Sequence, residues 1–256
     1  MNLNLPIDIA ENYSSPAQKI RVISEHWVNR SAFCPNCGNN LTPFENNQPV
    51  ADFYCPACAE EYELKSKNGL MGKKVVDGAY STMIDRLQAN NNPNFFFLSY
   101  DRRTFSIRNF LVVPKYFFVD SIIEQRKPLS ANARRAGWVG CNILLDGIPE
   151  FGKIFYVQNG LVNHKDRVLE KWEKTTFVRN THDIESKGWL FDVLICIDKL
   201  RKTEFSLDDV YKFEPLLKAK HPQNNNIQAK IRQQLQFLRD KNVIEFVRPG
   251  QYRLKH

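Results

Sequence analysis

The chain has 256 residues and a formal net charge of +8 at pH 7, and 43% of its residues are hydrophobic. This length accommodates one large domain, or a medium-sized domain with a smaller one, and is sufficient for a packed core. Every apolar run is shorter than the roughly 18 residues of a membrane-spanning helix, which excludes a helical membrane protein. The basic surplus is compatible with a polyanionic partner but does not require one.

The first residues of the chain have neither the basic region nor the long apolar region of a secretory signal. We therefore expect a cytoplasmic protein. In that reducing compartment the six cysteines are expected to be thiols or metal ligands and not disulfides.

A first helix is predicted to begin at residues 14–16 (Ser-Ser-Pro), because serine can cap a helix and proline suits its first turn. Ile20, Ile23 and Trp27 follow at helical spacing and form one apolar stripe, which indicates a helix packed against a sheet. Glu25 on this helix is a candidate additional acid of a metal site, but a solvent-facing residue is the favoured interpretation.

Four cysteines form two Cys-x2-Cys pairs, Cys34 with Cys37 and Cys55 with Cys58. This spacing is typical of a zinc ribbon, in which each pair supplies two thiolates and one ion joins two distant segments. Disulfides would need an oxidising compartment, and a redox motif would explain only one pair. The pattern predicts a structural zinc site, with no open coordination position for chemistry.

An acid, a second acid and a lysine are interleaved with these cysteines, at Asp52, Glu63 and Lys65. Glu63 and Lys65 lie on one face of any strand that they share, because strand side chains alternate with period two. A hairpin with its turn at the second cysteine pair would place Asp52 opposite Glu63. Two carboxylates that close repel unless a cation lies between them, and Mg2+ is the usual oxygen-bound ion. Taken alone, the pattern favours a solvated strand edge; a nucleic-acid-binding domain elsewhere in the chain would favour the catalytic interpretation.

Residues 67–74 form a basic segment interrupted by glycines, which is equally compatible with a phosphate-binding loop and with an ordinary surface loop. Asp77 and Gly78 are then predicted to lead into a helix that contains Met83 and Leu87 and ends at residues 90–93 (Asn-Asn-Asn-Pro).

Three apolar segments are predicted to be buried strands, at residues 94–100, 109–113 and 154–157. The first is apolar almost throughout, which indicates a central strand covered on both faces. Together with the strands at Asp52 and Glu63 they predict an α/β fold with a mixed sheet flanked by helices.

A basic segment without acids covers residues 126–138 and contains Arg134, Arg135 and Trp138. Such a loop can bind phosphates and press an aromatic ring onto a base. A tryptophan by itself is more often a core residue, so both interpretations of Trp138 remain open on this pattern.

The domain boundary is expected at residues 180–187, between a domain at residues 1–182 and a second at residues 185–256. The second domain is predicted to begin with an apolar helix at residues 189–200, in which Cys196 is a core residue. A further helix is capped by Ser206, followed by a turn and a long helix from Asn226 to Lys241.

The long helix has an apolar stripe of Ile227, Ile231, Leu235 and Leu238. A hairpin with Pro-Gly in its turn follows, and three helices before a hairpin indicate a winged helix. Polar side chains that can contact bases or phosphates lie on and before the opposite face of the long helix: Asn225, Asn226, Lys230, Arg232, Gln233 and Gln236. A winged helix used for protein contacts is the alternative.

The set Asp52, Glu63-x-Lys65 resembles the signature of the PD-(D/E)xK nucleases. Residues 44–55 (Phe-Glu-Asn-Asn-Gln-Pro-Val-Ala-Asp-Phe-Tyr-Cys) and the surrounding cysteines closely resemble the DpnI family of methyl-directed restriction endonucleases. The similarity continues through residues 92–97, 133–138 and 231–235 and covers nearly the whole chain. In this chain the proline and the aspartate of the signature are separated, and the proline carries no chemistry.

The resemblance implies a type II restriction endonuclease that cleaves double-stranded DNA at GATC sites whose adenines carry N6-methyl groups. It implies Mg2+ held by Asp52, Glu63 and the backbone carbonyl of Leu64, with Lys65 acting on the water or the transition state. It also implies that Trp138 senses the methylated site. We expect a monomer in a prokaryotic cytoplasm. The alternatives are a non-catalytic zinc-ribbon and winged-helix regulator, and a repair nuclease of the same fold.

Overall fold

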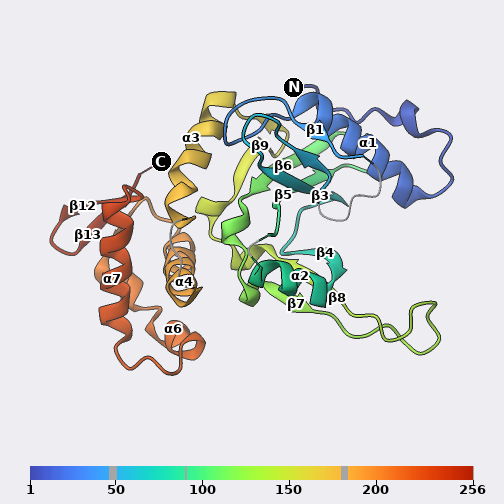
Figure 1. Cartoon of the computed structure of the whole chain (residues 1–256). Coiled ribbons are helices and arrows are strands. Elements are labelled where there is room, and N and C mark those ends of the chain that lie inside the picture. Colours follow the sequence, from blue (N-terminus) through green and yellow to red (C-terminus); the bar gives the residue numbers. More distant parts are fainter. Residues whose placement is uncertain (46–50, 90, 180–183, 256) are drawn as a thin grey trace. The chain divides into compact units, whose positions relative to one another are not determined.

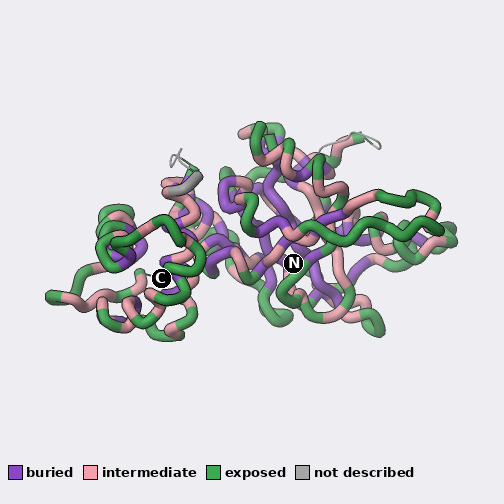
Figure 2. The backbone as a smooth tube through the Cα atoms, turned by 90° about the horizontal axis from the view of Figure 1, so that it is seen from below, coloured by how far each residue is buried: buried purple, intermediate pink, exposed green. Residues whose placement is uncertain are grey.

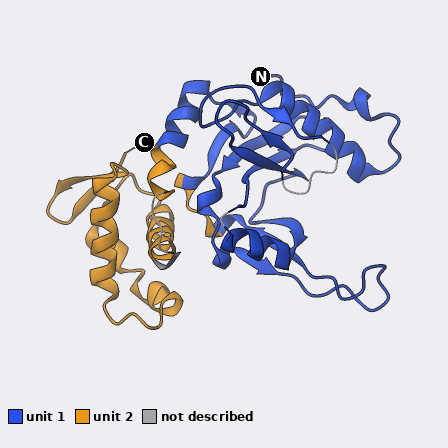
Figure 3. Ribbon diagram, viewed as in Figure 1, with its two compact units in different colours: residues 1–146, 152–173 blue, residues 147–151, 174–256 orange. Residues whose placement is uncertain are grey.

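The computed structural model describes residues 1–45, 51–89, 91–179 and 184–255. The chain divides into two compact units, residues 1–146 with 152–173 and residues 147–151 with 174–256 (Figure 3). The expected start of a strand at residues 48–50 lies outside the described residues, as does the part of the expected linker at residues 180–183.

A seven-stranded mixed sheet forms the centre of the first unit (Figure 1). The strands β3 and β5 pair in parallel, whereas the other neighbours are antiparallel. The order across the sheet is β1 (Thr42–Pro43), β2 (Phe53–Tyr54), β3 (Glu61–Asn68), β5 (Asn94–Tyr100), β6 (Ile107–Val113), β9 (Ile154–Gln158) and β10 (Leu161–Val162). The predicted mixed α/β fold is confirmed.

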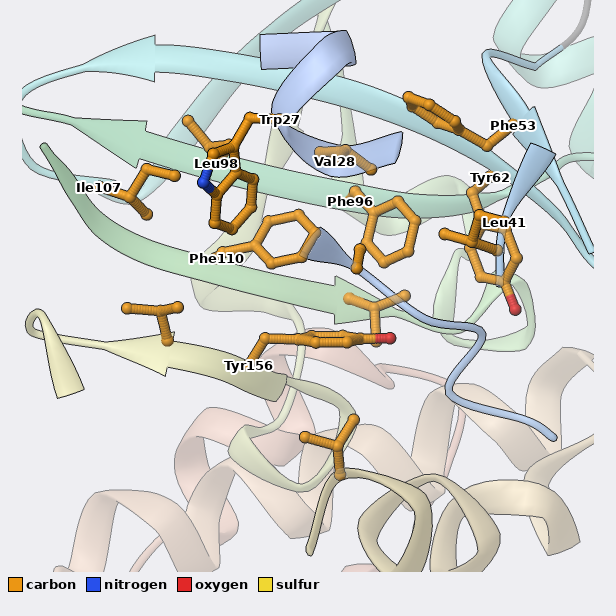
Figure 4. Packing of buried hydrophobic residues seen from close by; sticks show 14 of the residues in the cluster. Trp27, Val28, Leu41, Phe53, Tyr62, Phe96, Leu98, Ile107, Phe110 and Tyr156 are labelled. Atoms are coloured by element: carbon orange, nitrogen blue, oxygen red, sulfur yellow. The ribbon is translucent and has the colours of Figure 1, made fainter. Parts of the chain in front are cut away.

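The strand β5 is the central strand, and each of its seven residues is buried, as expected from its apolar sequence. One face of the sheet packs against helix α1 (Pro16–Ser31), where the Trp27 and Phe110 rings meet edge to face with centroids 5.2 Å apart. On the same face the Tyr62 and Phe96 rings stack at 4.7 Å (Figure 4). Because strand side chains alternate, Phe95 on β5 and Glu63 on β3 point to the opposite face of the sheet.

A second sheet of three antiparallel strands is formed by β4 (Lys74–Ala79), β8 (Gly140–Leu144) and β7 (Ile123–Gln125), in the order β4-β8-β7. As expected, Asp77 and Gly78 lead into a helix, because α2 (Tyr80–Gln88) begins two residues after Gly78. Both residues themselves belong to β4, a strand that was not expected from the sequence. The strand forms because β4 pairs with β8, a segment that lies far along the chain.

The basic segment between β7 and β8, residues 126–139, is a long loop that extends away from these strands in Figure 1. Helix α3 (Lys165–Thr175) follows β10. Short 3-10 helices connect the larger elements, at Ile7–Ala10, Lys115–Phe117, Asp120–Ile122, Leu145–Gly147, Glu150–Gly152 and Thr176–Val178.

The second unit is a helix-turn-helix fold with a three-stranded sheet in the order β11-β13-β12. Its elements are α4 (Ile184–Leu200), β11 (Glu204–Ser206), α5 (Leu207–Tyr211), α6 (Glu214–Lys220), α7 (Ile227–Asp240), β12 (Ile244–Arg248) and β13 (Gln251–Leu254). Helix α4 begins five residues earlier than expected, and the expected middle helix is two helices, because Pro215 lies in the first turn of α6.

The core of the second unit contains the expected stripe of α7, and Ile231, Leu235 and Leu238 are fully buried. Ser206 caps α5 in a reciprocal capping box with Asp209. Gly250 has φ of +71°, which the Pro-Gly turn of the hairpin requires. Figure 2 shows buried segments inside each unit and exposed ones on its connecting loops. No helix of the described residues is both long and apolar enough to cross a membrane.

Candidate active site and metal centre

The four cysteines predicted to bind zinc come together in one cluster. Their Sγ atoms all lie within 4.8 Å of one another, and the closest pairs are Cys37 with Cys55 at 3.4 Å and Cys34 with Cys58 at 3.5 Å. Sulfur atoms about 2.3 Å from one tetrahedral zinc ion would be about 3.8 Å apart, so the cluster has the dimensions of such a site. The cluster can therefore bind a metal such as zinc.

Each cysteine pair is a tight turn of the same kind. The Gly38 N–H donates to the Cys34 carbonyl and the Ala59 N–H to the Cys55 carbonyl, each at 2.8 Å, and both residues have positive φ. Burial opposes ionisation of Cys37, but hydrogen bonds from Asn39 outweigh it and lower the pKa of the thiol to about 7. A lowered pKa favours the thiolate, which is the form that binds metal.

The first cysteine turn is also anchored from other elements. The buried Tyr62 hydroxyl lies 3.1 Å from Cys34 Sγ, and Trp172 Nε1 on α3 donates to Asn36 Oδ1 at 3.0 Å. Such contacts orient metal-binding residues and hold them in place.

The second cysteine turn connects β2 to β3, as predicted, and determines where the two acids lie. The register pairs Phe53 with Tyr62, so Asp52 immediately precedes the paired residues and Glu63 immediately follows them. The Leu64 N–H donates to Asp52 Oδ2 at 2.7 Å and fixes the orientation of that carboxylate. A cluster that holds the turn therefore also holds Asp52 against the strand that carries Glu63.

Asp52, Glu63 and Lys65 line one pocket of about 250 Å³. Because Tyr62 and Leu64 pack into the core with α1, Glu63 and Lys65 point to the opposite face of the sheet. The same pocket is lined by residues of β4 and α2, namely Asp77, Gly78, Ala79, Thr82, Met83 and Arg86.

The charges in this pocket are close and largely buried. Lys65 Nζ lies 2.5 Å from Glu63 Oε1 and also contacts Asp77 Oδ1. Burial raises the pKa of Glu63; Lys65 opposes this effect, and the charges of Asp77 and Asp52 add to it. Burial would lower the pKa of Lys65, but the carboxylates of Glu63 and Asp77 outweigh it and raise the pKa. The pocket has three carboxylates and two cationic side chains, Lys65 and Arg86, and this excess of negative charge favours binding of an additional cation.

Asp77 and Arg86 belong to this pocket and were not identified from the sequence. Asp77 lies on the buried side of β4, two residues after the buried Val75. An aspartate on the same strand face as a buried valine was the feature of the sequence that could have identified it. Arg86 lies 3.7 Å from Glu63 Oε2 and is spaced by three residues from the buried Met83, which indicated a charge on the inward face of α2.

Glu25 is half-buried and paired with Arg21 on α1, with Nε and Oε1 2.6 Å apart. Burial raises its pKa, and the charge of Asp52 adds to this effect, so Glu25 lies within electrostatic range of the site. The favoured interpretation of a solvent-facing residue therefore describes only part of its environment.

Trp138 lies at the base of the long basic loop and is half-buried, not a core residue. The guanidinium of Arg135 lies over its ring, 4.7 Å from the centroid, and Arg134 is exposed. The ring rests on Gly140, where an added Cβ would lie 2.8 Å from two of its carbons. Gly140 pairs with Ala79, so the loop is joined to a strand that lines the pocket.

The helix α7 in the second unit presents the expected polar surface. Asn225, Asn226, Arg232, Gln233 and Gln236 are exposed, whereas Lys230 is half-buried. Arg232 donates to the Tyr211 hydroxyl at 2.6 Å, and Asn225 accepts from Lys218 at 3.1 Å, so two of these side chains have partners within the unit. Exposed amide and guanidinium groups on one helix can donate to base edges and phosphates.

Comparison with known families gives two matches that together cover most of the chain. The model of the Dam-replacing family, DpnI, matches residues 1–181. The model of the Dam-replacing HTH domain matches residues 185–254.

Proposed function

The chain belongs to the DpnI, or Dam-replacing, family, and from this membership we propose that it is a type II methyl-directed restriction endonuclease. The proposed substrate is double-stranded DNA with N6-methyladenine at GATC sites. The observation that carries the proposal is the pocket that brings Asp52, Glu63 and Lys65 together on one face of β3. The proposed domains are residues 1–182 for catalysis and residues 185–256 for DNA binding.

Asp52 and Glu63 are the proposed Mg2+ ligands, with the backbone carbonyl of Leu64. The donor set fits a hard cation, because carboxylate and carbonyl oxygens are its usual ligands and the carboxylates of this pocket repel one another. Bound Mg2+ would activate water and offset the charge of the phosphodiester.

The residues of the chain have separate proposed roles in hydrolysis. The hydrogen bond from the Leu64 N–H keeps the Asp52 carboxylate in one orientation, so this group need not become ordered when the ion binds. Lys65 is held in its charged form by Glu63 and Asp77 and can orient the attacking water or stabilise charge that develops on the phosphate. Arg86 adds a second positive charge at the pocket.

The four cysteines are proposed to bind structural Zn2+. Four thiolates leave no open position for a substrate, so the ion would hold the β2-β3 turn and take no part in chemistry.

Two regions are proposed to contact DNA: the loop with Arg134, Arg135 and Trp138, and the polar surface of α7. A methyl group has no hydrogen-bonding capacity, so its recognition needs van der Waals contact with an apolar surface such as an indole ring. None of the described cysteines is in a disulfide. We propose that the chain acts as a monomer in a reducing prokaryotic cytoplasm.

The test is digestion of one plasmid in two forms, methylated and unmethylated at the adenines of GATC, with and without Mg2+. Cleavage of only the methylated form, and only with the ion, is expected. Cleavage of both forms would support a nuclease without methyl dependence. Absence of cleavage with retained DNA binding would support the non-catalytic regulator instead.

The Asp52→Ala variant assigns the chemistry to this pocket. It is expected to abolish cleavage and retain DNA binding, because it removes a proposed ligand and leaves both DNA-contacting regions intact. Unchanged cleavage by this variant would reject the catalytic assignment of Asp52.

A further inference from the structure

Asp77 is a buried carboxylate that reaches the pocket from the second sheet. Its side chain is only 6% exposed, and its Oδ1 contacts Lys65 Nζ. Among the described residues, Lys65 is the only cation that it contacts. A carboxylate this buried is costly unless it is paired, so the contact with Lys65 is a strong constraint on both groups.

Lys65 has a second partner, Glu63, whose carboxylate is also a proposed ligand of the divalent ion. The Glu63 carboxylate lies 2.5 Å from Lys65 Nζ and is also near Arg86. A divalent ion held by Glu63 competes with Lys65 for the same oxygens, because both are attracted by one negative charge. Lys65 would then need another fixed anion to hold its ammonium group in place within a largely buried pocket.

Asp77 meets this requirement because it comes from a different element than the proposed ligands. Asp52 and Glu63 flank the β2-β3 turn, whereas Asp77 is on β4, which pairs with β8. The side chains of Val75 and Asp77 share one face of β4, and Val75 is buried, so packing of Val75 directs Asp77 towards the pocket.

We infer that Asp77 is a positioning residue that holds the ammonium group of Lys65 at the reacting phosphate while Glu63 binds the divalent ion. This inference rests on the proposed function and adds a residue to its site. Asp77 neither binds the ion nor touches DNA in this role; it acts through Lys65.

The experiment compares full-length wild type with Asp77→Ala and Asp77→Asn. Three quantities are measured for each: the single-turnover rate constant for cleavage of a methylated GATC duplex, the affinity for that duplex with Ca2+ in place of Mg2+, and the Mg2+ concentration that gives half the maximal rate. The matched control is Asp101→Asn, which removes the charge of an aspartate paired with Arg108 outside the pocket.

Asp77→Ala is expected to lower the rate constant about 10- to 100-fold, the loss typical of a reacting group displaced by about 1 Å. The duplex affinity and the half-maximal Mg2+ concentration are expected to stay unchanged. Asp77→Asn is expected to lose less, because the amide oxygen still accepts a hydrogen bond from Lys65 but carries no charge. Asp101→Asn is expected to cleave as wild type does.

Several results would overturn the inference. An unchanged rate constant in Asp77→Ala would show that Lys65 needs no second anion, and a raised half-maximal Mg2+ concentration would make Asp77 a metal ligand. Equal loss of duplex affinity and rate would indicate a purely structural role. Thermal unfolding shows which variants are folded, and if Asp77→Ala is not, the same criteria applied to Asp77→Asn decide.

The proposed function fails separately. If wild type does not cleave the methylated duplex, both the function and the role of Asp77 are rejected. If wild type cleaves and the Asp77 variants cleave equally well, only the role of Asp77 is rejected.

Discussion

The contact between Trp138 and Gly140 gives a direct test of the proposal that the basic loop recognises the methyl group. Gly140 is buried in β8 and pairs with Ala79 of β4, so its backbone cannot move easily. In Gly140→Ala the new Cβ would lie 2.8 Å from two carbons of the Trp138 ring. The ring must therefore move, and its half-exposed position lets it move towards solvent.

The size of the effect follows from that distance. Ordinary van der Waals contact begins at 3.4 Å, so the ring must shift by at least 0.6 Å from its place at 2.8 Å. Overpacking usually lowers the unfolding free energy by about 1–3 kcal/mol, and we expect about 1 kcal/mol because the ring can yield outwards. We expect the preference for methylated over unmethylated DNA to fall about tenfold, which corresponds to about 1.4 kcal/mol of lost contact.

The assay measures single-turnover cleavage of methylated and unmethylated duplexes, with thermal unfolding in parallel. Gly188→Ala is the matched control, because an added Cβ there has open space around it in α4. An unchanged preference in Gly140→Ala would refute the reasoning that Trp138 contacts the methyl group. A preference that falls equally in both variants would refute the specific role of the contact between Trp138 and Gly140.

Three further predictions concern the two units and their charges. Cys58→Ser is expected to reduce bound zinc below one equivalent and to lower the thermal stability, since one of four thiolates is lost; elemental analysis that still finds one zinc per chain would contradict this. Ser206→Ala is expected to lower the stability of the second unit by about 1 kcal/mol, measured by denaturant unfolding, because the Asp209 N–H loses its 3.0 Å bond to Ser206 Oγ. The hydrogen bond from Arg108 lowers the pKa of Asp101 from 3.8 to about 2. The charged Asp101 therefore stabilises the folded wild type fully above pH 3.8, and this stabilisation is lost as the pH falls to about 2. Asp101→Asn is expected to remove it. Acid unfolding curves of the two proteins should therefore converge near pH 2, and curves that differ equally at all pH values would disprove this linkage.

The sequence by itself determined the features that depend on spacing within one element. The two cysteine pairs predicted the metal cluster, and the period of two along β3 predicted that Glu63 and Lys65 share a face. The second cysteine pair was expected at a hairpin turn, which predicted that Asp52 lies opposite Glu63. The pairing of Phe53 with Tyr62 places the two acids at the next position of that register. The buried stripe of α7 and the Pro-Gly hairpin predicted the winged helix in the same way.

Tertiary structure alone decided which other groups share the pocket. Asp77 was assigned to the approach of a helix, because a short segment with two valines and a glycine has no periodicity strong enough to identify a strand. Its strand exists through pairing with β8, and the same pairing joins Gly140, on which Trp138 rests, to Ala79 of the pocket lining. Local spacing specifies the side of an element on which a residue lies, whereas the packing of distant elements specifies what that side faces. The proposed ligands could therefore be identified from the sequence, whereas Asp77, the second anion that contacts Lys65, could not.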